Sequence, residues 1–242
     1  MRDGIIFLSA IVLGLGIAAA GWFVGEGFIE GRASDRFVTV KGVSERDVRA
    51  DLALWPIRYV ATHDDLGRAQ GEIKRSHQQV LAFLEKHGID PGAAEVQMLE
   101  VNDRLANPYQ TEAMQSRYIV SQSLMVRTEE IEKVRTAAQA LGELVDEGVV
   151  LSSSGGPPGG PIYLYTALSD RKPEMIAEAT AEARRAAEQF ALDSGSRVGR
   201  IRRANQGLFV ILPRDRAPGV EESSQLEKTL RVVSTIDYYL ED

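Results

Sequence analysis

The feature that most limits what this chain can form is an uncharged apolar run near its N-terminus, residues 4–24. These 21 residues, at about 1.5 Å of rise each, make a helix of roughly 31 Å, and the hydrocarbon core of a bilayer is about 30 Å thick. A cleavable signal is the alternative, because Ala18 and Ala20 form an A-x-A-like site. Signal peptides, however, have apolar regions of about 7–15 residues and a more basic start. We therefore predict an uncleaved transmembrane helix.

This helix would place the rest of the chain outside the cytoplasm. We expect residues 1–33 to form a single-pass anchor and linker in the cell (inner) membrane, with residues 4–24 in the lipid bilayer and the following domain in the periplasm. Gly21 with Gly25, and Gly27 with Gly31, have the spacing that lets membrane helices approach closely. Glycine is also common in membrane helices that do not pair, so both interpretations stay open.

Charge and cysteine usage exclude several classes of function. The formal net charge is −7, whereas a nucleic-acid-binding surface needs a concentrated basic face. The arginine-rich stretch 197–203 has no interleaved aromatic residues, and we interpret it as a solvated strand or turn. The chain has no cysteine, which excludes disulfides, thiol nucleophiles and thiolate metal sites. We expect no nucleic-acid partner.

Hydrophobic periodicity gives the order of elements in residues 34–242. Alternation typical of strands occurs in residues 36–40, 51–62, 94–106, 117–127, 149–152 continuing in 163–168, 197–211 and 228–240. Spacing typical of helices occurs in residues 64–88, 128–145 and 170–193. The order is therefore ββα-ββα-βα-ββ. Because strands come in pairs, we predict one α+β domain with a largely antiparallel sheet and helices packed on one face.

Each predicted helix should bury one face. The expected buried residues are Leu66, Ala69, Ile73, Val80 and Leu84 in the first, Ile131, Val134, Ala138, Leu141 and Val145 in the second, and Ile176, Ala179, Ala183, Ala187 and Phe190 in the third. Asp64 and Asp65 are expected to start the first helix, and Thr128 to cap the second. In the first strand, Gly42 is interpreted as a bend or bulge.

The strand at 51–62 is apolar on both faces, with Trp55 on one and Leu54 on the other. One helix layer covers only one face of a sheet, so the other face needs a second cover. We expect either residues 208–224 or a neighbouring subunit to provide it. Pro56 cannot donate to a strand ladder, which predicts a local edge or bulge.

The element order and its punctuating residues resemble the SIMPL-domain family, which includes bacterial periplasmic 26 kDa immunogenic proteins. The resemblance rests on Val38-Thr39-Val40-Lys41-Gly42, Asp51-Leu52-Ala53, Leu84-Glu85-Lys86-His87-Gly88-Ile89, Ala181-Glu182-Ala183-Arg184 and Arg197-Val198-Gly199. It implies an extracytoplasmic α+β domain with internal repetition, ring-like oligomers, and a role in envelope or oxidative-stress physiology. It supplies no catalytic residues. The anchor and the segment 208–224 depart from the family pattern.

No residue set predicts catalysis, a cofactor or a metal. His63, His77 and His87 lack the spacing of metal ligands, and His77 is expected to be half-buried and hydrogen-bonded. The acidic pair 64–65 and the pair 129–130 precede helices, where the helix dipole explains them, and a third pair occupies 221–222. The loop 152–161 has prolines, no lysine and a strand after it, so it is interpreted as a loop and not a phosphate cradle.

These observations predict a non-enzymatic, membrane-anchored structural or binding module that forms homo-oligomers. Two alternatives stay open. One is a hydrolase-like enzyme whose site is assembled from distant residues, and the other is a ring- or pore-forming envelope component. A pocket with convergent titratable groups would favour the enzyme, whereas a broad apolar patch or an exposed strand edge would favour assembly.

Overall fold

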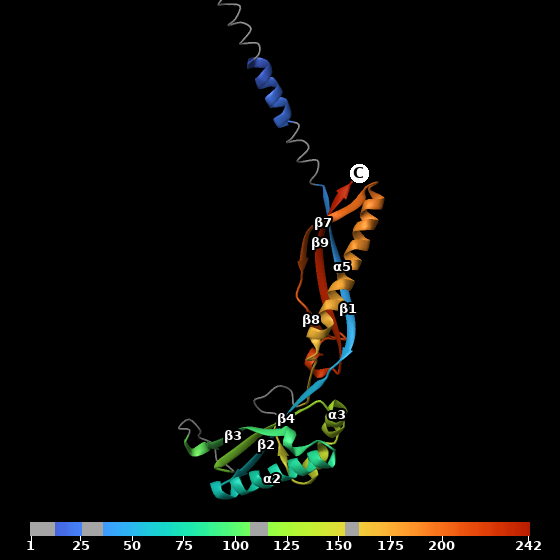
Figure 1. Ribbon diagram of the computed structural model, residues 1–242. Helices are drawn as coiled ribbons and strands as arrows, with labels where there is room; N and C mark the ends of the chain where they lie inside the picture. Colours follow the sequence, from blue (N-terminus) through green and yellow to red (C-terminus); the bar gives the residue numbers. More distant parts are fainter. Residues whose placement is uncertain (1–12, 26–35, 107–115, 153–159) are drawn as a thin grey trace, which may run out of the picture. The chain divides into compact units, whose positions relative to one another are not determined.

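The computed structural model describes residues 13–25, 36–106, 116–152 and 160–242 (Figure 1). The domain expected at 34–242 contains parts of two compact units. The first unit comprises Met1–Ser44, Pro173–Phe209 and Val232–Asp242, and the second comprises Glu45–Lys172 and Val210–Arg231. Besides the main elements below, short 3-10 turns occupy Pro91–Ala93, Arg104–Ala106 and Glu222–Ser224.

The described part of the apolar run is helical over residues 13–25. Residues 4–12 of the predicted transmembrane helix, and the pair Gly27 and Gly31, lie outside the described residues. Among the residues that the structure describes, no helix is both long enough and apolar enough to cross a membrane.

The second unit is built on a five-stranded antiparallel sheet. Its strands are β2 (Leu52–His63), β3 (Ala94–Asp103), β4 (Tyr118–Thr128), β5 (Val150–Leu151) and β6 (Ile162–Leu164). The order is β3-β4-β2, with β5 and β6 on the far side of β2. Residues 52–54 of β2 pair with β6, and residues 59–60 pair with β5. Pro56 lies between these two segments, so no described strand that would need its missing N–H lies beside it at this edge of β2.

The core of this unit lies between one face of the sheet and helix α2 (Leu66–Lys86). Every second residue of β2, including Trp55 and Tyr59, is buried against the helix stripe of Ile73 and Val80, as the periodicity predicts. The ring of Trp55 meets Phe83 edge-on, with centroids 6.5 Å apart. The predicted boundaries of the helix also hold.

The helix caps explain those boundaries. The Asp65 carboxylate accepts a hydrogen bond from the backbone N–H of Arg68 at 2.8 Å, which satisfies one of the free donors of the first turn. At the other end Gly88 has φ +75°, a left-handed conformation that ends helices and that other residues rarely adopt.

The second predicted helix is broken into α3 (Ile131–Gln139) and α4 (Gly142–Asp146). The expected stripe holds for Ile131 and Val134 and then slips. The fully buried residues Ala137 and Leu144 continue the 3–4 spacing from Ile131 and Val134. Ala138 and Leu141 pack on the core partly buried, and Val145 is 57% exposed. The N-cap is Glu130, and Thr128 contributes by accepting the Glu130 N–H at 3.1 Å.

The first unit combines parts of α5 (Leu168–Asp193), β1 (Phe37–Arg49), β7 (Arg197–Gln206) and β9 (Glu227–Glu241). The three strands follow the order β1-β9-β7. Its core packs Val40, Ile236 and Tyr238 against Ala183 and Ala187. A fourth strand, β8 (Val210–Pro213), pairs antiparallel with residues 228–231 of β9 in the second unit.

Helix α5 buries an unbroken i, i+4 row of small residues after Met175, namely Ala179, Ala183, Ala187 and Ala191. The prediction was wrong at the ends of this stripe, since Ile176 is only half-buried and Phe190 is 60% exposed. Residues four apart are offset by a small angle around the helix axis, so a row with constant i+4 spacing winds slowly around α5. The predicted stripe mixed spacings of three and four residues and therefore did not follow this row at its ends.

Gly42 allows the helix to lie directly on β1. A Cβ atom at this position would collide with the backbone carbonyl of Ala179 and the backbone nitrogen of Ala183. The strand continues through Gly42 as part of β1, and the glycine allows a close approach of two backbones. Next to it, the Val43 N–H donates to the Glu182 carboxylate and the Ser44 hydroxyl donates to Glu178 at 2.8 Å.

The structure confirms an α+β fold with antiparallel sheets and helices. One sheet is predicted from the sequence, whereas the described residues form two. Alternation within each strand identifies strands well, but it carries no information on which strands pair. The assignment of β1, β7, β8 and β9 to a separate sheet therefore comes from tertiary contacts alone.

We expect Gly42→Ala to destabilise the protein by more than about 3 kcal/mol, because the new methyl group meets backbone atoms that cannot rotate away. Gly71→Ala is the matched control. It lies inside α2 with open space around its Cβ position, so it should stabilise by roughly 0.5–1 kcal/mol. Urea unfolding followed by circular dichroism measures both. Equal stability of the two variants would contradict the close-packing role of Gly42.

Candidate interaction surface at the β3 edge

Strand β3 lies at one end of the five-stranded sheet and pairs only with β4 among the described residues. Four large apolar side chains on this strand are 44–55% exposed: Val96, Met98, Leu99 and Val101. A free edge strand presents unpaired backbone N–H and C=O groups to solvent. The combination of a free edge with exposed apolar side chains makes β3 the leading candidate for an interaction surface.

The register of β3 shows why these side chains stay exposed. Val96, Leu99 and Val101 lie opposite Leu124, Gln122 and Val120, so they share the face of the sheet that α2 covers. The register shift between Val96 and Met98 turns Met98 to the other face. Helix α2 packs on β2 and β4. The helix-side residues of β3 therefore face the core side without being buried.

A hollow of about 360 Å³ separates β3 from α2, and we call it the β3 groove. It is lined by Gln70, Ile73, Lys74, His77 and Gln78 from α2, Leu99 from β3 and Gln122 from β4. Its walls are apolar at Ile73 and Leu99 and polar at His77 and Gln122. Mixed lining of this kind is typical of small-molecule sites.

Two buried polar groups lie at the base of this region. The Tyr59 hydroxyl is 2.8 Å from Nδ1 of His77, and burial raises the pKa of Tyr59 to about 12. The Gln122 side chain is only 9% exposed, and its amide forms no hydrogen bond to another described residue. His77 is thus half-buried and hydrogen-bonded, as the sequence predicts.

The charge on β3 is acidic, from Glu95, Glu100 and Asp103. Asp103 accepts two hydrogen bonds from the Arg117 guanidinium, at 2.8 and 3.1 Å, and this pairing lowers the pKa of the Asp103 carboxyl. Asp103 therefore stays ionised below its usual range and fixes the end of β3 to the start of β4.

A second hollow, of about 710 Å³, is lined by residues of β2, α2 and the start of β5, among them Glu72, Arg75 and Glu147. These are the convergent titratable groups that an enzyme would require, but the nearest recorded pairing joins Arg75 only weakly to Glu72, at 4.0 Å.

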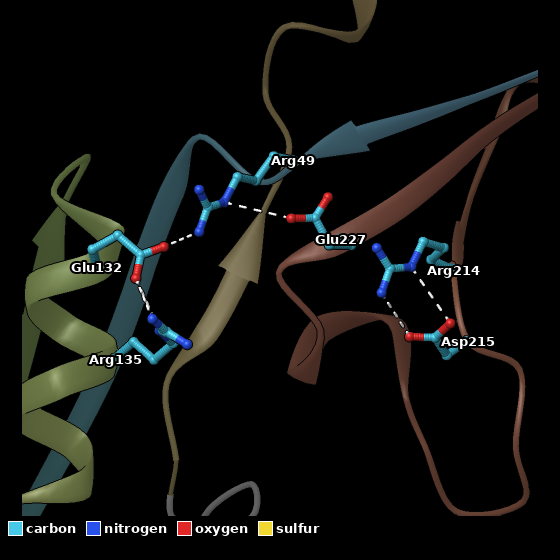
Figure 2. Close-up of polar contacts among 6 residues, drawn as sticks. All are labelled: Arg49, Glu132, Arg135, Arg214, Asp215 and Glu227. Carbon is cyan, nitrogen blue, oxygen red and sulfur yellow. Dashed lines mark hydrogen bonds and ion pairs between the residues drawn. The ribbon is translucent and has the colours of Figure 1, made fainter.

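The third group is an ion-pair network around Arg49, shown in Figure 2. The Arg49 guanidinium contacts Glu132 and lies 3.6 Å from Glu227, while Glu132 also binds Arg135 at 2.7 Å (Figure 2). Arg214 pairs with Asp215 at 3.1 Å beside them. These side chains are about 40–70% exposed, so solvent weakens each pair, and the pairs serve mainly to fix β1, α3 and β9 locally.

The structure places the other residues that the sequence singled out in structural roles. His63 accepts the Asp65 N–H at 2.9 Å, and His87 stacks on Phe83 with ring centroids 4.5 Å apart. Within the described ranges, no three His, Asp or Glu side chains gather closely enough to hold a metal ion. Residues 153–159 of the Gly/Pro loop lie outside the described residues.

The acidic pairs have separate partners. Asp64 accepts the backbone N–H of Arg117 at 3.1 Å, and Glu130 pairs with Lys133 at 2.5 Å. Glu222 binds Lys228, whose side chain is fully buried. These carboxylates are not brought together as a general acid and base.

Sequence reasoning missed three features. Lys228 is buried in β9, where its Nζ donates to the Glu222 carbonyl at 2.7 Å. The second feature is the pair of aromatic residues next to the arginine-rich strand β7. The Arg202 guanidinium lies 4.0 Å from the ring centre of Phe37, on β1, and 6.0 Å from that of Tyr239, on β9, and neither residue is near Arg202 in the sequence. The third is Gln122, a polar residue at a buried position of β4, and its break in an otherwise apolar alternation was a usable signal.

The family model for SIMPL, described as a protein of unknown function (DUF541), matches residues 38–233. The chain belongs to the SIMPL family. The match extends through residues 208–224, the segment interpreted as an insertion. A search among curated proteins finds no match. One of the motifs behind the resemblance has a clear role, since the Asp51 carboxylate accepts the N–H groups of Thr166 and Ala167 at 2.8 and 3.0 Å.

We expect His77→Gln to cost about 1–2 kcal/mol, because it leaves the buried Tyr59 hydroxyl without a well-placed partner. His87→Gln should also destabilise, because it removes the tilted ring contact with Phe83 and the 3.3 Å contact with Glu143. His63→Gln is the control, since a glutamine oxygen can accept the Asp65 N–H. Thermal unfolding of the three variants provides the test, and a loss confined to His63→Gln would refute these assignments.

Proposed function

We propose that this SIMPL protein is a non-enzymatic module that is anchored in the membrane, with its folded domain outside the cytoplasm. It works by assembling with further copies of itself through the β3 edge. The observation that carries this proposal is the free edge of β3 with its four exposed apolar side chains. The resemblance to periplasmic family members supports the location, and their ring-like oligomers support the assembly.

A comparison with β7, an edge strand of the other sheet, supports the choice of β3. Strand β7 ends the other sheet, but it carries Arg197, Arg200, Arg202 and Arg203 and two register shifts. Charge and bulges on an edge oppose pairing with other strands. Strand β3 has a single register shift and carries three acidic residues, Glu95, Glu100 and Asp103, of which Asp103 is paired with Arg117. It is therefore the less protected edge of the two.

The outer face of β2, which the sequence made the leading interface, is a weaker candidate. Leu52 is buried within the single chain, and Leu54 and Val60 are half-buried. The pairing of Leu54 with Ile162 of β6 places a neighbouring strand beside it. A charged residue at Leu54 would disturb the fold as well as any interface, so it is a poor probe of assembly.

The enzyme alternative has less support from the titratable groups. The carboxylates around Arg49 are engaged in ion pairs, and Glu222 is engaged by Lys228. In the second hollow, Glu72, Arg75 and Glu147 show no arrangement of a nucleophile with a base. These contacts support the proposal of a structural or binding module.

We expect the full chain in lipid nanodiscs or mild detergent to sediment as an oligomer, and Val101→Lys to shift it to smaller species. A lysine at this 44% exposed position can reach solvent in the single chain but would be buried by an added strand. Ile201→Lys is the matched control, because Ile201 is 46% exposed on the β7 edge. Analytical ultracentrifugation distinguishes the variants. A monomeric wild type, or equal effects of both lysines, would reject assembly through β3.

The anchor is tested separately. We expect intact-mass analysis of membrane-extracted protein to find Met1 or Arg2 as the first residue, because the uncharged run 4–24 is longer than a signal-peptide core. Alkaline carbonate washing should leave the protein in the membrane pellet. A mature N-terminus near Gly21 in the soluble fraction would show a cleaved signal instead.

A further inference from the structure

We propose that the β3 groove binds a small carboxylic acid with a short apolar or aromatic body. This inference stands apart from the assembly proposed above, because every residue of the groove belongs to one chain. Its volume of about 360 Å³ lies within the usual range of small-molecule sites, roughly 300–1,000 Å³.

The polar groups of the groove are hydrogen-bond donors suited to an anion. Lys74 contributes an ammonium group, and the lining contains no Asp or Glu. The Tyr59 hydroxyl lies 2.8 Å from Nδ1 of His77. In the proposed complex the hydroxyl donates to Nδ1, and the imidazole proton on Nε2 is then a second donor to the ligand. Burial raises the pKa of Tyr59 to about 12, so its hydroxyl stays protonated well above neutral pH.

Gln122 is the observation that points to an occupant. Its side chain is more than nine-tenths buried, lines the groove, and makes no hydrogen bond to another described residue. Among the described residues, the fully enclosed polar side-chain atom without a hydrogen-bond partner is Nε of Arg231, so the Gln122 amide reaches the open space of the groove. There its N–H can donate to a ligand carboxylate. The amide lies opposite Leu99 in the register of β3 and β4, so the polar base and an apolar wall are adjacent.

The two walls define the rest of the ligand. Ile73 is buried on α2 and Leu99 is 55% exposed on β3, so the groove offers apolar contact on both sides. A body that fills the space between them would cover Leu99. The chemistry is therefore a carboxylate directed at Gln122, His77 and Lys74, with a hydrocarbon chain or ring between Ile73 and Leu99.

The test uses the full chain in nanodiscs of neutral lipid, with hexanoate and benzoate as probes and empty nanodiscs as the blank. Isothermal titration calorimetry should detect binding of both acids and none of hexylammonium, which has the same body and the opposite charge. Lys74→Gln and Gln122→Leu should each weaken binding about tenfold, the effect of one charge-assisted hydrogen bond. Arg75→Gln is the matched control, because it removes a cation from the next residue, which lines the other hollow.

Three outcomes would overturn the proposal: no binding of either acid up to its solubility limit, equal binding of hexylammonium, or equal weakening by Lys74→Gln and Arg75→Gln. Circular dichroism of Gln122→Leu verifies that the variant is folded, and Lys74→Gln, at an exposed position, carries the test if it is not. Repeating the titration with Val101→Lys separates this inference from assembly. Binding that persists in that variant supports the groove even if the chain does not oligomerise through β3.

Discussion

A helix with its side chains is about 10 Å wide and neighbouring strands lie about 4.8 Å apart, so a single helix covers roughly two strands of a sheet. In the second unit α2 covers β2 and β4, and the sheet continues to a third strand. This mismatch in width accounts for three features together. It gives the buried core under α2, the groove beside it, and the exposed helix-side residues of β3. The features that we connect with function thus follow from the same packing that stabilises the unit.

The first unit solves a different packing problem. A row of alanines on α5 and the bare backbone at Gly42 let the helix lie close to β1, where a larger residue would collide. Close packing of this kind gains dispersion contacts without long side chains to order. It also has no tolerance for added volume at Gly42. The second unit instead fills its core with large side chains such as Trp55 and Phe83.

Membership in the SIMPL family fixes the fold class and leaves the biochemical role to be established from this chain's own surfaces. We propose two neighbouring surfaces, the β3 edge and the β3 groove, for different kinds of partner. The β3 edge offers backbone groups and apolar side chains to another strand, whereas the β3 groove offers a few donors to a small anion. Because Leu99 belongs to both, a ligand in the groove and a strand at the edge would contact the same side chain.

The sequence by itself determined the elements and most of their buried faces. Alternation in residues 52–63 and the stripe of Ile73 and Val80 depend only on neighbours along the chain, so local pattern predicts them. The predicted stripe was off by one position at Ala137 and Leu144 and wrong at Phe190, because spacings of three and four residues both keep to one helix face and only the packing partners decide between them.

Tertiary structure alone decided the division into two sheets, the free edges and the groove. Val101 and Trp55 look alike as alternating strand residues, yet one is exposed and the other buried because α2 reaches only one of their strands. The same holds for His77, whose partner Tyr59 lies on another element. Burial and polar pairing depend on which strands pair with one another. That pairing is made by contacts between residues far apart in the chain, which the local pattern of a single sequence does not reveal.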